Sequence, residues 1–239
     1  MLSPGGTKRY DGIASSQKGS EGDMVDKRDV FRAFRSAGAA ANLYLRVKLR
    51  ICPLIEIASR VPARGHVVDL GCGNGLFAAL LLLGSDARRV TGFDLDPAKL
   101  RVAERLKRDN GWGRAEFREA DIVRLTYPPA DIYTLIDVLY LLSPSDQEAV
   151  LRKCARALPP GGTLVVKEMD TRPRWKYAWN CFQETVSVRV VGFTLGKKFF
   201  FRPREEFERL LGSLGFAVAT VPLGRGQIHP HVLYVCRKG

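Results

Sequence analysis

The sequence lacks paired cysteines. Its cysteines are odd in number and scattered, and no two form a C-x-x-C pair: Cys52, Cys72, Cys154, Cys181 and Cys236. This pattern argues against a disulfide framework and against a structural zinc site, so we predict no metal site. It fits a reducing compartment, and we therefore expect a cytoplasmic protein.

Long hydrophobic runs are also missing. Residues 1–29 contain no apolar stretch of the kind that a signal peptide needs. The longest strongly apolar run near a predicted helix covers residues 77–84, far short of the ~20 residues that span a bilayer. We therefore expect that the chain is not an integral membrane protein.

Acidic residues are few relative to basic ones. The chain has 25 Asp and Glu against 38 Lys and Arg, which gives a formal net charge of +13. This excess favours anionic partners, such as nucleic acid, a phospholipid surface or an acidic small molecule. Charge alone does not choose among them, and a solvated basic surface without a specific partner fits equally well.

What is present indicates one α/β domain with an N-terminal extension. The length of 239 residues, with 46% hydrophobic and 26% charged residues, suits a single globular domain. Residues 1–25 are poor in large apolar side chains and predict a flexible tail. Residues 26–62 predict a helical N-terminal cap: a short basic amphipathic helix near residues 30–35, then an apolar stretch, residues 43–61, that Pro53 should break.

From residue 63 to residue 239, β-rich runs alternate with helical patterns. This alternation predicts a doubly wound, mostly parallel, seven-stranded sheet. The expected strands cover residues 66–70, 89–94, 115–119, 132–137, 163–168, 217–221 and 231–236, and the expected helices cover residues 76–83, 97–110, 143–158 and 205–214. The pattern loosens in residues 170–204, which we interpret as an insertion on the acceptor side of the domain.

A glycine loop follows the first predicted strand and precedes a helix. Its residues are Asp69, Leu70, Gly71, Cys72, Gly73, Asn74 and Gly75. Glycines permit the turn, and their missing Cβ atoms let a ligand lie against the backbone near a helix N-terminus. The spacing is G-x-G-x-G rather than the dinucleotide G-x-G-x-x-G, and Asp69 would disfavour a pyrophosphate. The loop therefore predicts a cationic, phosphate-free cofactor.

Two further acids follow the next strands. Asp94 ends the second predicted strand, where a carboxylate can accept both hydroxyls of a ribose. Asp121 follows the third, where it could accept a hydrogen bond from the exocyclic amine of adenine. Each acid alone is more typical of a helix cap or a solvated turn. Asp69, Asp94 and Asp121 at successive strand ends, together with the glycines, favour an adenosyl cofactor.

These segments, together with residues 158–164, resemble the class I S-adenosylmethionine-dependent methyltransferases over roughly residues 60–170. The resemblance implies that S-adenosylmethionine is the cofactor. It implies that Asp94 binds the ribose, that Asp121 binds the adenine amine, and that Leu95 and Ile122 lie against the adenine ring. The methionine portion would be held by Asp69, Gly71, Cys72, Gly73, Asn74 and Gly75.

The fourth predicted strand ends in Asp137-Val138-Leu139-Tyr140. In the resembled family, residues at this place face the sulfonium methyl, so Asp137 is a cofactor-binding candidate as well as a catalytic one. The two prolines of the (Asn/Asp)-Pro-Pro-(Tyr/Phe) signature of amine-methylating members are missing here. No Pro-Cys pair of the RNA cytosine type is present either. The resemblance therefore favours methylation of oxygen.

A hydroxyl acceptor needs a base, and the candidates are Asp137, Glu168, His229 and His231. Both histidines could equally be incidental residues of a surface loop. For acceptor binding we expect Tyr140 and the aromatic and basic residues of the insertion: Trp175, Lys176 and Trp179. The insertion could instead be a structural helix that covers the sheet.

The basic N-terminal helix and the aromatic residues 197–202 would suit an anionic membrane surface, although both could equally pack on the core. We therefore predict methylation, on oxygen, of a small or lipid-like metabolite, by a protein that can associate peripherally with membranes. One alternative is an RNA methyltransferase, which the charge supports but no RNA-binding module does. Another is a partner subunit that binds the cofactor without catalysis.

Overall fold

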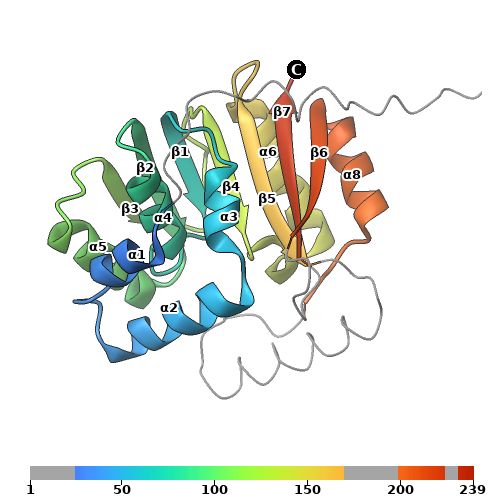
Figure 1. Cartoon of the computed structure of the whole chain (residues 1–239). Helices are drawn as coiled ribbons and strands as arrows, with labels where there is room; N and C mark the ends of the chain where they lie inside the picture. Colours follow the sequence, from blue (N-terminus) through green and yellow to red (C-terminus); the bar gives the residue numbers. More distant parts are fainter. Residues whose placement is uncertain (1–24, 170–198, 224–230) are drawn as a thin grey trace, which may run out of the picture.

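The structure is a computed structural model, and it describes residues 25–169, 199–223 and 231–239. A central sheet lies between two layers of helices (Figure 1). The three-layer arrangement follows from the alternation of strands and helices, because each crossover helix must cover one face of a parallel sheet.

The sheet has seven strands in the order β3-β2-β1-β4-β5-β7-β6. Their bounds are β1 (Gly65–Leu70), β2 (Arg88–Asp94), β3 (Ala115–Glu119), β4 (Ile132–Ile136), β5 (Thr163–Met169), β6 (Phe216–Leu223) and β7 (His231–Lys238). The first five are parallel, and β7 is antiparallel to both β5 and β6. All seven predicted strands are confirmed, and so is the class I methyltransferase type of sheet. The strand order reverses between β1 and β4, which is where ligands bind in open α/β sheets.

The crossover helices also lie where the sequence predicts them. They are α4 (Leu76–Gly84), α5 (Pro97–Asp109), α6 (Pro144–Ala157) and α8 (Arg204–Ser213). The Asp96 side chain caps α5 by accepting hydrogen bonds from the amides of Ala98 and Lys99, and Pro97 occupies the first helical position. The sequence did not predict the short 3-10 helix η1 (Leu139–Leu141), which follows β4.

The core consists of two clusters, one on each face of the sheet. Val67 and Val90 belong to the cluster that the N-terminal helices and α4 cover. Val68 and Leu135 belong to the cluster that α6 and α8 cover. The strands of the sheet's centre are therefore apolar on both faces, as expected for a buried parallel sheet.

The N-terminal cap comprises α1 (Lys27–Ala33), α2 (Ala39–Ile51) and α3 (Leu54–Ser59). The break between α2 and α3 falls at Cys52 and Pro53, as predicted. Buried apolar residues on each helix join the cap to the first core cluster. In Figure 1, α2 runs along the edge at which the parallel strands end. Within the described ranges, no helix is both long enough and apolar enough to cross a membrane.

Candidate active site

The glycine loop turns away from the end of β1 through backbone conformations that only glycine adopts readily. Gly71 has φ +77°, and its amide donates a 2.8 Å hydrogen bond to the Phe93 carbonyl at the end of β2. A Cβ atom at Gly71 would lie 2.5 Å from Cγ2 of Val138. The loop therefore requires glycine at position 71 for two reasons, conformation and space.

Asp69 is the buried acid of this loop, with only 1% of its surface exposed. Its Oδ1 accepts a 2.6 Å hydrogen bond from the Thr134 hydroxyl, while no described group donates to Oδ2. The pKa of Asp69 is raised to about 7. Burial is the main cause and nearby Asp94 adds to it, while the hydrogen bond from Thr134 acts in the opposite direction. A buried carboxylate oxygen without a donor, beside a glycine turn, fits a cationic ammonium group.

Asp94 joins the glycine loop to the end of β2. Its Oδ2 accepts a 2.8 Å hydrogen bond from the Gly73 amide, and its Oδ1 accepts one of 2.9 Å from the Asp96 amide. The neighbouring Leu95 side chain is 53% exposed. This arrangement suits an adenosine, because the adenine ring could pack on the exposed Leu95 while the ribose hydroxyls donate hydrogen bonds to Asp94.

Asp121 lies in the turn after β3. Its Oδ1 accepts a 2.8 Å hydrogen bond from the Val123 amide, and its Oδ2 is 3.5 Å from the Arg124 guanidinium. Ile122 is buried, with 6% of its surface exposed. Asp121 thus has the turn-forming role that is common for aspartate. Its contact with adenine stays a prediction.

Asp137, directly after β4, lies between two lysines. It is the only non-glycine residue with positive φ (58°) in the part of the chain that the structure describes. Its Oδ2 is 2.7 Å from Nζ of Lys48 on α2, and its Oδ1 pairs with Nζ of Lys167 on β5. Burial alone would raise the pKa of Asp137, but the two ammonium groups outweigh it and hold the pKa far below the usual range. The carboxylate is therefore ionised and fully engaged.

Glu168 follows Lys167 on β5 and, unlike the ionised Asp137, has a raised pKa. It is buried, its carboxylate accepts from the Leu139 amide, and Oε1 has no hydrogen-bond partner within the described ranges. Burial and the charge of Asp137 raise its pKa to about 8 although Lys167 lowers it. Glu168 is consequently mostly protonated near neutral pH.

His231 begins β7, opposite Met169 of β5. Its Nε2 donates to the Ile51 carbonyl at the end of α2, over 2.8 Å. This contact holds the end of α2 at the sheet edge, and because Nε2 donates in it, Nδ1 is the ring nitrogen that could accept a proton. His229, Trp175, Lys176 and Trp179 lie outside the described residues, so their predicted roles stay predictions.

Tyr140 packs against the segment of residues 199–202. Its ring lies 5.1 Å from that of Phe201 and 5.8 Å from that of Phe199, and its carbonyl accepts a 2.8 Å hydrogen bond from the Phe200 amide. The three phenylalanines are half-buried. The structure therefore favours the alternative in which these aromatics pack on the domain.

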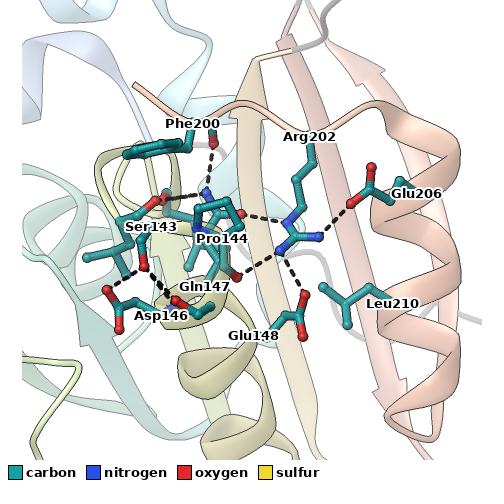
Figure 2. A network of polar contacts seen from close by, with 12 residues as sticks. Ser143, Pro144, Asp146, Gln147, Glu148, Phe200, Arg202, Glu206 and Leu210 are labelled. Carbon is teal, nitrogen blue, oxygen red and sulfur yellow. Dashed lines mark hydrogen bonds and ion pairs between the residues drawn. The ribbon is translucent and has the colours of Figure 1, made fainter. Parts of the chain in front are cut away.

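Arg202 fixes the same segment between α6 and α8 (Figure 2). Its guanidinium donates to the Gln147 side chain (2.8 Å), the Pro144 carbonyl (2.7 Å), Glu148 (2.9 Å) and Glu206 (2.6 Å). All five hydrogens of a guanidinium can be used in such a fork, which a lysine could not reproduce.

Gln147 extends this network to η1. Its buried amide nitrogen lies within hydrogen-bond distance of three carbonyl oxygens, those of Leu139 (3.1 Å), Leu142 (3.2 Å) and Phe200 (2.7 Å), so its two hydrogens are shared among them. The network therefore holds η1, whose Leu139 amide meets Glu168, in a defined position close after Asp137 in the chain.

Sequence reasoning missed the residues that pair with the candidate acid. Lys48 falls in the apolar stretch of residues 43–61 and Lys167 in the predicted strand of residues 163–168, and neither was predicted to pair with an acid. Lys167 did offer a signal, because it is a lysine within an otherwise apolar run, Leu164-Val165-Val166-Lys167, and buried lysines are almost always paired. Among the residues with described positions, no three His, Cys, Asp or Glu side chains group closely enough to hold a metal ion.

Comparison with known proteins bears on residues 67–162, which match a family model described as a methyltransferase domain. A carboxy-S-adenosyl-L-methionine synthase from Chromohalobacter salexigens is 38% identical over 45% of this chain, and a trans-aconitate 2-methyltransferase from Paracidovorax citrulli is 38% identical over 52%. The chain spans only 41% and 46% of these two relatives. A solved O-methyltransferase family protein from Burkholderia thailandensis shares the fold, with a TM-score of 0.66 at 20% identity, over 90% of this chain and 63% of that one.

Proposed function

We propose that the domain containing residues 67–162, which matches a methyltransferase-domain family model, is that of a class I S-adenosylmethionine-dependent methyltransferase, and that the chain methylates an oxygen atom of a small molecule. The observation that carries the proposal is the geometry of the part of the site that would bind the methyl donor, which we call the donor side. Oδ2 of Asp69 is buried and accepts no hydrogen bond from any described group. Gly71 forms the turn beside it, and Leu95 is exposed next to Asp94.

When bound, S-adenosylmethionine supplies a methyl group on a sulfonium, which an acceptor atom takes in an in-line displacement as the carbon–sulfur bond breaks. The residues then have distinct tasks. Asp69 would accept from the ammonium of the methionine portion, and Asp94 from the ribose. Asp137 is engaged by two lysines and is a poor base. Glu168 is the better candidate to receive a proton, at pH values near or above its raised pKa.

Binding of S-adenosylhomocysteine by titration calorimetry tests the donor site. We expect Asp94→Ala to weaken binding strongly, because it removes the ribose acceptor and the partner of the Gly73 amide. Asp86→Ala is the matched control, since the Asp86 side chain is 96% exposed in its pair with Arg114. Equal affinity in the wild type and both variants would refute the assignment of the site.

Transfer of labelled methyl groups into cell extract, sorted into small-molecule, lipid, RNA and protein pools, tests the reaction. Label in the small-molecule or lipid pool supports the proposal. Label in a nuclease-sensitive pool would favour the RNA methyltransferase alternative, which rests on the net charge of +13. Binding without any transfer would favour a non-catalytic partner, or a different reaction, as the name of the carboxy-S-adenosyl-L-methionine synthase relative illustrates.

The lipid-like acceptor and the peripheral location are supported by the outer face of α2. Leu43, Val47 and Ile51, spaced four residues apart, are 64%, 49% and 40% exposed, and Arg46 and Arg50 are exposed on the same helix. Such a face suits the surface of an anionic membrane. Flotation with vesicles that contain phosphatidylserine tests this. If the protein stays in solution at low salt, or if Leu43→Glu floats like the wild type, this part of the proposal fails.

A further inference from the structure

The charges beside Asp137 do not balance. Lys48 and Lys167 both pair with this single carboxylate. Among the residues with described positions, Asp137 is the carboxylate that acts on the Lys48 ammonium, and the other groups that act on it are the ring hydroxyls of Tyr44 and Tyr140 and the thiol of Cys52.

Glu168 is the second carboxyl group near the lysines, and it is mostly protonated near neutral pH. The described residues at the end of β4 and β5 thus carry two positive charges and one negative charge. A sulfonium placed beside them would add a third positive charge. Buried charge without a counterion is costly, so this place favours an anion.

We infer that Lys48 and Lys167, held together by Asp137, form a subsite for a carboxylate of the methyl acceptor. This inference rests on the proposed function and names its substrate class, an organic acid that is ionised at neutral pH. Where the reacting oxygen belongs to that carboxylate, it is already an anion, and methylation then needs no base.

Lys48 is the contact that such an acid reaches. Its side chain is 20% exposed, against 1% for Lys167, so only Lys48 has a surface that a ligand can touch. Asp137 fixes its ammonium at 2.7 Å, and α2 brings it to the edge at which β4 and β5 end. Lys167 lies beneath and adds its charge without exposure. Lys48 therefore determines specificity, and Lys167 is a positioning residue.

The experiment uses the full chain with labelled S-adenosylmethionine. Before methylation, a metabolite extract is separated on an anion-exchange resin at neutral pH into a retained, acidic pool and an unretained pool, and each pool is then offered as substrate. We expect label to enter the retained pool. Lys48→Met should reduce this incorporation about ten- to hundredfold, since a charged hydrogen bond to substrate is lost, and Lys48→Arg should restore part of it. Arg152→Met is the matched control, because it removes an exposed charge of α6 to which no part of the site is assigned, and it should leave incorporation unchanged.

Binding of benzoate, with benzamide as its neutral analogue, tests the subsite without turnover. In the presence of S-adenosylhomocysteine, benzoate should raise the melting temperature of the wild type and of Arg152→Met, but not of Lys48→Met, and benzamide should raise none. Label in the unretained pool, or equal loss in Lys48→Met and Arg152→Met, overturns the inference. If neither pool takes label while benzoate still binds through Lys48, the subsite stands and the transfer reaction fails. Melting and cofactor affinity in Lys48→Met show whether that variant is folded.

Discussion

The buried carboxyl of Asp69 should make donor binding depend on pH in a range where most aspartates do not titrate. Its pKa is raised to about 7 in the absence of ligand. The ammonium of the donor binds the ionised form and not the protonated form, so a proton and the ligand compete. Affinity is therefore highest above the pKa and falls as the pH is lowered through it.

The size of this effect follows from the pKa alone. The apparent dissociation constant scales with the inverse of the ionised fraction of Asp69. Between about pH 7.5 and about pH 5.5 that fraction falls roughly twentyfold, so S-adenosylhomocysteine should bind roughly twentyfold more weakly at the lower pH. Titration calorimetry in buffers of matched ionic strength measures the change.

Two variants separate this cause from general acid effects. Asp69→Asn should bind more weakly at every pH and lose the pH dependence. Thr134→Val removes the 2.6 Å hydrogen bond that lowers the pKa of Asp69, so the midpoint should move up by about one pH unit. A flat profile in the wild type, or an unchanged slope in Asp69→Asn, would show that Asp69 does not meet the ammonium.

Three further predictions concern other parts of the site. Gly71→Ala should abolish cofactor binding and cost more stability than Gly111→Ala in urea unfolding, because both have positive φ but only Gly71 has a side chain 2.5 Å from the added Cβ; equal losses would contradict this. Arg202→Met should lower the free energy of unfolding by about 1–3 kcal/mol, since it removes the donor to buried Gln147 and two ion pairs, whereas exposed Arg209→Met should stay within about 0.5 kcal/mol. Above about pH 8, where Glu168 loses its proton and becomes anionic, the KM for an acidic acceptor should rise, and Glu168→Gln should show no such rise.

The fold was readable from the sequence because its signals are local. Strand and helix alternate, Asp96 and Pro97 mark the start of α5, and Pro53 separates α2 from α3. The donor side was readable for the same reason, since the glycine loop is continuous and Asp94 lies at a fixed place after the next strand. The 3-10 helix η1 was not predicted, because three residues give no periodicity.

The acceptor side could not be predicted in the same way, because its contacts join distant segments. Lys48 and Asp137 are 89 residues apart, and only the position of α2 across the sheet edge brings them together. Arg202 meets Glu148 across 54 residues. Hydrophobic periodicity places each helix against the core, but it does not specify which lysine meets which carboxylate.

The position of β7 has a consequence for the order in which the site can assemble during synthesis. β7 follows β6 in the chain but lies between β5 and β6 in the sheet, and its His231 holds the end of α2 through the Ile51 carbonyl, 180 residues earlier. Contacts of such sequence separation form late, because the intervening chain must first be ordered. A nascent chain can therefore form β1, β2, β3 and the glycine loop on the ribosome before the hydrogen bond between His231 of β7 and Ile51 of α2 exists. The part of the site that binds the methyl donor can thus form early in synthesis, whereas the acceptor part forms only after residue 231 has been added.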